Sequence, residues 1–200
     1  MQDHTQVLSA LRKLGARIKG KLHQSDYYFA PPYLDVGEKG SIVRVREDVH
    51  ERGKSRKILS YKTPNKPVGG VETREEIEVE VSGETRPLIE LLTRIKVKPI
   101  ATVKKERTEY TLTYEGVSFT VTLDKVETLG SFVEIELLSS RKDDVKQLIA
   151  LGEGLATKLN IDTSRKIGLG YHELMLMKEA TRLDSSHQNK NDSGGAYIAQ

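Results

Sequence analysis

Hydrophobic and polar residues alternate with a period of two along several stretches of the chain, which is the pattern of half-buried β-strands. The stretch ETREEIEVEV at residues 72–81 is a clear case, because its later glutamates alternate with isoleucine and valine. A strand of this kind has one apolar face and one charged face. The same alternation predicts further strands at 24–32, 41–48, 56–64, 101–114, 117–126 and 131–138.

Apolar residues at helical spacing predict three helices and a short helical stretch, at 6–16, 85–97, 142–161 and 171–180. The dipeptide Glu115-Gly116 lies between two of the strands and predicts a tight hairpin. Residues 181–200 are polar and contain glycine and serine, which predicts a flexible tail. We therefore expect one domain over residues 1–180, followed by this tail.

The polar faces of the strands carry charges of one sign at successive positions, as in the R-x-R of VRVRE and the E-x-E of VEIE. An antiparallel sheet with one solvent-facing side is the simpler alternative, but such faces usually mix threonine, serine, glutamine and lysine. The opposite faces are apolar, and the predicted helices are available to cover them. With the helices outside, the charged faces turn toward one another. This arrangement predicts an α+β fold, an antiparallel β-barrel with a charged lumen and helices packed outside.

Composition narrows the classes of protein that fit this pattern. The net charge of +3 is the small difference between 32 basic and 29 acidic residues, which argues against a general nucleic-acid binder. The chain has no cysteine, so disulfides and thiolate metal sites are excluded. No apolar run approaches the ~20 residues that span a membrane, and no signal peptide opens the chain. We therefore expect a cytoplasmic protein.

The charges predicted to line the lumen are of the two kinds that polyphosphate chemistry requires. Carboxylate oxygens are hard donors suited to Mg²⁺ or Mn²⁺, and arginine binds phosphate oxygens through two parallel hydrogen bonds. Buried charges are costly unless they are paired or ligated, which favours a ligand in the lumen. The five histidines form no i, i+4 pair and the serines lack a histidine–aspartate partner pattern, so neither a zinc site nor a serine hydrolase is expected.

Seven short motifs follow one another along the chain between about residue 5 and residue 178. They are QSDYYF, VRVRE, LSYKTP, REEIEV, VKKERTEY, VTLDKVETLGSFVEIE and GYHELML. In this order they resemble the CYTH-domain proteins, a family of class IV adenylate cyclases and thiamine or inorganic triphosphatases that is also called the triphosphate tunnel metalloenzymes. HQSDYYF and the long sixth motif are most similar to the cyclase branch. The resemblance implies an eight-stranded antiparallel barrel whose tunnel binds a nucleoside triphosphate or tripolyphosphate with a divalent metal.

The resemblance also implies roles for individual residues. The phosphate groups would be held by Arg44, Arg46, Lys62, Arg74, Lys105 and Arg107. The metal, Mg²⁺ or Mn²⁺, would be served directly or through water by Glu76, Glu78, Asp124, Glu134 and Glu136. The family pattern begins with an E-x-E-x-K strand before the first helix, and this chain shows none. We therefore expect a domain that lacks the usual first strand and has an open sheet edge, and we favour truncation as the cause because the other motifs are intact.

Together these features predict a divalent-metal-dependent enzyme acting on triphosphates, in the manner of a class IV adenylate cyclase that converts ATP to cAMP and pyrophosphate. The same groups would let water attack the γ-phosphorus, so an inorganic or thiamine triphosphatase is the first alternative. A polyphosphate- or nucleotide-binding module without turnover is the second. The expected partner is the nucleoside triphosphate or tripolyphosphate itself, with no nucleic acid and no membrane, and a homodimer is left open.

Overall fold

The computed structural model describes residues 4–31, 40–66, 73–137 and 145–191, and for 183–191 the backbone alone. One antiparallel sheet of seven strands forms its centre, in the order β4-β3-β2-β1-β5-β6-β7. The strands are β1 Arg17–Ala30, β2 Ile42–His50, β3 Ser55–Lys62, β4 Glu76–Glu80, β5 Lys98–Tyr114, β6 Val117–Val126 and β7 Gly130–Glu136. The helices are α1 His4–Lys13, α2 Thr85–Arg94, α3 Val145–Lys158, the short η2 Thr163–Arg165 and α4 Tyr171–Asn191.

The strands that the alternation predicted are all present, and the hairpin between β5 and β6 is confirmed. Glu115 and Gly116 have φ angles of 49° and 77°, the left-handed pair that a two-residue hairpin turn needs. The two largest differences from the predicted boundaries are in β1 and α4. β1 begins at Arg17 rather than at residue 24, because its first residues are exposed and are held by pairing with β5 rather than by burial. α4 continues to Asn191 instead of ending near residue 180.

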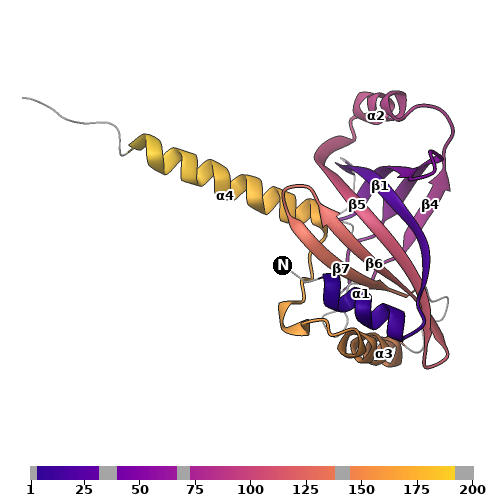
Figure 1. Cartoon of the computed structure of the whole chain (residues 1–200). Helices are drawn as coiled ribbons and strands as arrows, with labels where there is room; N and C mark the ends of the chain where they lie inside the picture. The colour runs from indigo at the N-terminus through magenta and orange to yellow at the C-terminus, as the bar shows by residue number, and fades with distance from the viewer. Residues whose placement is uncertain (1–3, 32–39, 67–72, 138–144, 192–200) are drawn as a thin grey trace, which may run out of the picture.

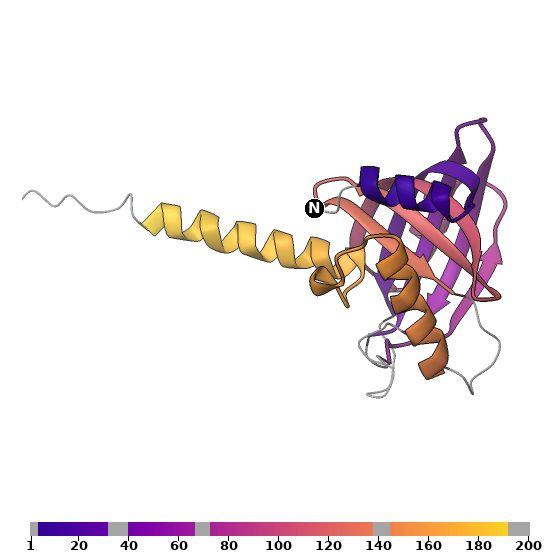
Figure 2. The same cartoon turned by 60° about the horizontal axis from the view of Figure 1, so that its bottom comes forward.

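The sheet is curled, with α1 and α3 against one part of its outer side and α2 at another (Figures 1 and 2). Within the described residues, β4 and β7 are the two edges of the sheet and do not pair with each other. The closed eight-stranded barrel implied by the resemblance is therefore not seen in this part of the chain, where the sheet has seven strands. None of the described helices is both long and apolar enough to cross a membrane.

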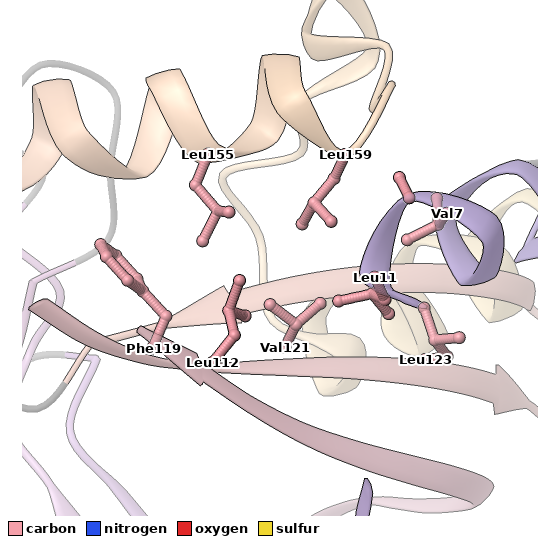
Figure 3. Packing of buried hydrophobic residues seen from close by; sticks show 9 residues of the cluster. Val7, Leu11, Leu112, Phe119, Val121, Leu123, Leu155 and Leu159 are labelled. Atoms are coloured by element: carbon pink, nitrogen blue, oxygen red, sulfur yellow. The ribbon is translucent and has the colours of Figure 1, made fainter. Parts of the chain in front are cut away.

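The largest hydrophobic core lies on the outer side of the sheet. Figure 3 shows side chains of α1 and of the α3 region directed at side chains of β5 and β6: Val7, Leu11, Leu155 and Leu159 against Leu112, Phe119, Val121 and Leu123. A second outer cluster packs Leu92 of α2 on Phe29 and Val45. Because successive side chains of a strand point to opposite faces, this packing turns the alternate, charged positions inward.

The first turns of α4 pack on the opposite, concave side of the sheet. Tyr171 joins Tyr28, Ile42, Val103 and Val126 in a third buried cluster there. Beyond this contact α4 extends away from the sheet, as both views show (Figures 1 and 2). The start of α4 therefore covers part of the charged face.

Candidate functional site on the inner face of the sheet

We call the concave face of the sheet, opposite the side that α1, α2 and α3 cover, the inner face. Strand register brings residues from distant parts of the sequence into rows across it. One row runs from Arg44 to Ser60 to Glu78, and another pairs Arg107 with Asp124. By this register, ten of the eleven predicted site residues lie on the inner face: Arg44, Arg46, Lys62, Glu76, Glu78, Lys105, Arg107, Asp124, Glu134 and Glu136.

Two bidentate ion pairs form the buried centre of the inner face. Asp26 accepts hydrogen bonds from Arg46 Nε at 2.6 Å and Nη2 at 2.8 Å. Asp124 accepts from Arg107 Nε at 2.7 Å, and Arg107 also pairs with Glu134. Both aspartates are 0% exposed. Burial alone would raise the pKa of each aspartate, but Arg46 and Arg107 outweigh it and hold the pKa of Asp26 and of Asp124 below the usual range.

Lys105 lies between these two pairs. Its Nζ is 3.3 Å from Asp124 Oδ2 and 3.9 Å from Asp26 Oδ2, and it lies 4.8 Å from the ring centroid of Tyr171. The Tyr171 hydroxyl donates to Asp124 Oδ2 at 3.0 Å. Burial, and then the neighbouring Arg107, lower the pKa of Lys105. The centre thus holds a buried cation between two aspartates that are each already paired with an arginine.

A second group of ion pairs lies at the β4 edge. Arg44 Nη2 donates to Glu76 Oε1 at 2.8 Å and to Glu78 Oε1 at 3.0 Å, while Lys62 Nζ donates to Glu76 Oε2 at 2.8 Å. Burial would raise the pKa of Glu76, but Arg44 and Lys62 lower it. Burial and the charge of Glu76 raise the pKa of Glu78. The two glutamates therefore repel each other and share the cations beside them.

The remaining predicted residues lie around these groups. Glu136 is on β7, at the edge opposite β4, and Arg74 precedes β4. Burial lowers the pKa of Arg74, and the charges of Glu173 and Glu76 oppose that shift. Arg74 thus belongs to the electrostatic surroundings of the β4 edge and of α4.

Comparison with known proteins identifies the family of this chain. Residues 2–171 match the CYTH domain family. The chain belongs to the CYTH domain family. A Methanocaldococcus jannaschii protein named "Putative adenylate cyclase" is 27% identical over 175 residues, which cover 87% of this chain and 93% of that protein.

Solved structures show the same fold. A Pyrococcus horikoshii protein has a TM-score of 0.75 and 30% identity, with 87% of this chain and 94% of that chain covered. A Hippeastrum protein described as a "putative adenylyl cyclase" with "a dominant" triphosphatase activity has a TM-score of 0.51 and 19% identity, covering 80% of this chain and 85% of its own. At that identity the second likeness concerns the fold alone.

The donors of this CYTH domain fit a divalent metal only in part. Among the described residues, no three histidine, aspartate or glutamate side chains are grouped closely enough to hold a metal ion. The five carboxylates predicted to serve the metal are divided between the β4 edge, the centre and β7, and Asp124 is engaged by Arg107. Mg²⁺ is usually bound by one or two carboxylates together with substrate phosphates and water. Glu76 and Glu78 fit that mode, because their oxygens converge on one point.

Sequence reasoning missed several inner-face residues of the CYTH domain, above all Asp26. Asp26 lies two residues from both Gln24 and Tyr28, so the alternation places all three side chains on one face of the strand. This shared face is the sequence signal that could have identified Asp26. Gln24 donates to Asp48 Oδ1 at 2.8 Å, which adds a further acidic residue to the buried set. His172 is a packing residue, since its ring stacks on Tyr28 with 4.7 Å between centroids.

The stability of the CYTH domain should depend on His172 between pH 7 and 5. Burial lowers the pKa of His172; Glu173 opposes the shift, whereas Arg74 and Lys62 add to it. Because the folded pKa is below the unfolded value of 6.5, this stabilisation is complete above pH 6.5 and is lost as the pH falls through the folded pKa. Urea unfolding of the wild type should give a decreasing free energy of unfolding from pH 7 to 5.

The variant His172→Phe keeps a ring on Tyr28 and removes the titrating group. Its free energy of unfolding should therefore change much less over the same pH range. His23, an exposed strand histidine, provides the control, and His23→Phe should retain the wild-type slope. Equal slopes for His172→Phe and the wild type would contradict the assignment.

Proposed function

We propose that this CYTH domain is a divalent-metal-dependent enzyme acting on triphosphates, with cyclisation of ATP to cAMP and pyrophosphate as its leading reaction. The observation that carries the proposal is the set of buried cations on the inner face, of which Arg44, Lys105 and Arg107 are almost fully buried. Cations are expensive to bury, and a polyanion supplies the charge that compensates them. The cyclase name of the M. jannaschii relative supports the same reaction class.

The inner face supports this chemistry through its own side chains. Lys105 and Arg107 would bind and orient phosphate oxygens at the centre, and Arg44 and Lys62 would do so near β4, where Glu76 and Glu78 would hold the metal. A bound Mg²⁺ or Mn²⁺ would neutralise charge on the phosphate oxygens. In cyclisation the ribose 3′-oxygen bonds to the α-phosphorus, the bond to the pyrophosphate oxygen breaks, and the hydroxyl proton is released. Charge stabilisation and positioning by these cations would be the main source of rate acceleration.

Hydrolysis of tripolyphosphate is the second candidate. The charged groups of the inner face are all of the kind that binds phosphate or metal. Tyr28 and His172, whose rings could stack on a base, are stacked on each other. The two rings are therefore already engaged with each other, and a substrate without a nucleoside would make all the contacts that the charged groups offer. Water would then attack the γ-phosphorus and orthophosphate would leave.

A product assay separates these functions. The protein is incubated with Mg²⁺ or Mn²⁺ and either ATP or tripolyphosphate, and products are separated by ion-exchange chromatography. Cyclic AMP with pyrophosphate supports the cyclase, and orthophosphate supports the triphosphatase. Binding of either compound without any product overturns the enzyme proposal in favour of a binding module.

A further inference from the structure

Two carboxylates at the β4 edge share a single nitrogen atom. Glu76 Oε1 and Glu78 Oε1 lie 2.8 Å and 3.0 Å from the same Nη2 of Arg44. Both oxygens therefore face one point that is occupied by positive charge. Glu76 also keeps Lys62 on its other oxygen, at 2.8 Å. The guanidinium thus stands where another cation could be held by the same two oxygens.

These pairs differ from the pairs at the centre in how easily they can open. The side chains of Glu76 and Glu78 are 27% and 43% exposed, whereas those of Asp26 and Asp124 are 0% exposed. Opening a buried pair leaves an uncompensated buried charge, which is strongly unfavourable. A partly exposed carboxylate can take up water or a metal ion instead. Both carboxylate partners of Arg44 are therefore open to water or metal, whereas Arg46 and Arg107 each have a fully buried aspartate as a partner.

Arg44 also has a hydrogen-bond donor that the protein does not use. Its Nε is buried without a partner, and so is the hydroxyl of Ser60, which lies directly opposite Arg44 on β3. Ser60 in turn lies opposite Glu78 on β4. Buried donors without an acceptor are rare in proteins, because losing the hydrogen bonds that water would make is unfavourable. Two adjacent ones indicate a place for the oxygen atoms of a ligand.

Building on the proposed function, we propose that Arg44 is a displaceable cation that holds the metal's place in the free protein. When the triphosphate binds, a divalent metal takes the position between Glu76 and Glu78. The released guanidinium, together with the Ser60 hydroxyl, then binds phosphate oxygens. Metal and Arg44 thus compete for the glutamates, while phosphate favours the arrangement in which the metal has replaced Arg44. Ser60 becomes a phosphate-binding residue.

The competition is tested by binding two probes separately to Arg44→Met. In isothermal titration calorimetry, Mn²⁺ alone should bind this variant about tenfold more tightly than the wild type, because its competitor is gone. Tripolyphosphate in metal-free buffer should bind about tenfold more weakly, because the contact between phosphate and the unpaired Nε of Arg44 is lost; tenfold corresponds to about 1.4 kcal/mol. Opposite changes in Arg44→Met, without such changes in a control that loses the same charge elsewhere, indicate that Arg44 serves both partners.

Arg56→Met is the matched control. Arg56 lies on β3, and its Nε pairs with Glu80 of β4 at 3.9 Å, with both side chains largely exposed. The variant loses the same unit of charge without touching Glu76 or Glu78, so both affinities should stay within about twofold of the wild type. Ser60→Ala should leave Mn²⁺ affinity unchanged and weaken tripolyphosphate binding about fivefold.

An unchanged or weakened Mn²⁺ affinity in folded Arg44→Met would overturn the proposal. If circular dichroism shows that this variant is unfolded, Arg44→Lys takes its place. The lysine retains a charge near the glutamates and lacks Nε, so tripolyphosphate binding should weaken while Mn²⁺ affinity stays the same; undiminished tripolyphosphate binding would contradict the idea. Wild-type protein that binds neither ATP nor tripolyphosphate would instead refute the proposed function.

Discussion

Replacing Asp26 with alanine should lower the free energy of unfolding by about 3–5 kcal/mol, which is the usual cost of breaking a buried ion pair from one side. Asp26 is fully buried and receives two hydrogen bonds from Arg46, at 2.6 Å and 2.8 Å. Without the carboxylate, the guanidinium remains inside the curled sheet with no charge to compensate it. Urea denaturation monitored by far-UV circular dichroism measures the change.

Two further variants separate this explanation from a general effect of charge. Replacing both partners, as Asp26→Leu with Arg46→Met, should recover most of the lost stability, because no buried ion is left unpaired. Glu80→Ala removes a carboxylate whose pair with Arg56 is 3.9 Å long and exposed, and it should change stability by less than about 0.5 kcal/mol. An Asp26→Ala variant within about 1 kcal/mol of the wild type would show that the pair is not buried in solution.

Replacing Lys105 with methionine should reduce turnover at least about 100-fold while leaving stability unchanged or increased. Lys105 is 5% exposed, and burial with the charge of Arg107 lowers its pKa, so the protein itself disfavours this charge. Methionine keeps the apolar stem on the Tyr171 ring and removes the ammonium group. Asp26 and Asp124 still retain their arginines. A gain in stability with a loss of activity is expected of a residue kept for its ligand.

Lys104 provides the control for this prediction. It is the preceding residue of β5, points to the outer side and is exposed. Lys104→Met makes the same chemical change on the other face, and it should alter neither turnover nor melting temperature appreciably. Turnover by Lys105→Met within about threefold of the wild type, or a melting temperature lowered as in Asp26→Ala, would contradict a role in binding the triphosphate.

Much of the inner face could be predicted from local patterns. Side chains two residues apart on a strand point the same way, so Arg44 with Arg46, and Glu76 with Glu78, had to share a face wherever their strands lay. The apolar positions between them had to be covered, and the amphipathic helices were the segments able to cover them. These inferences need only the geometry of a single strand or helix, and for that reason the sequence alone determined them.

Register and burial were decided only by the tertiary structure. Alternation places Asp26 on one face of its strand, but only the pairing of strands set it opposite Arg46 and beside Lys105. The contact between Tyr171 and Asp124 joins residues 47 positions apart, because α4 begins against the inner face. Likewise, the five predicted metal carboxylates looked equivalent in sequence, and the order of strands divided them between two sheet edges and a buried centre. The alternation along a strand determines which face a side chain takes. Which charged side chains meet, and how deeply they are buried, depends on contacts between distant segments, because no local pattern specifies those contacts.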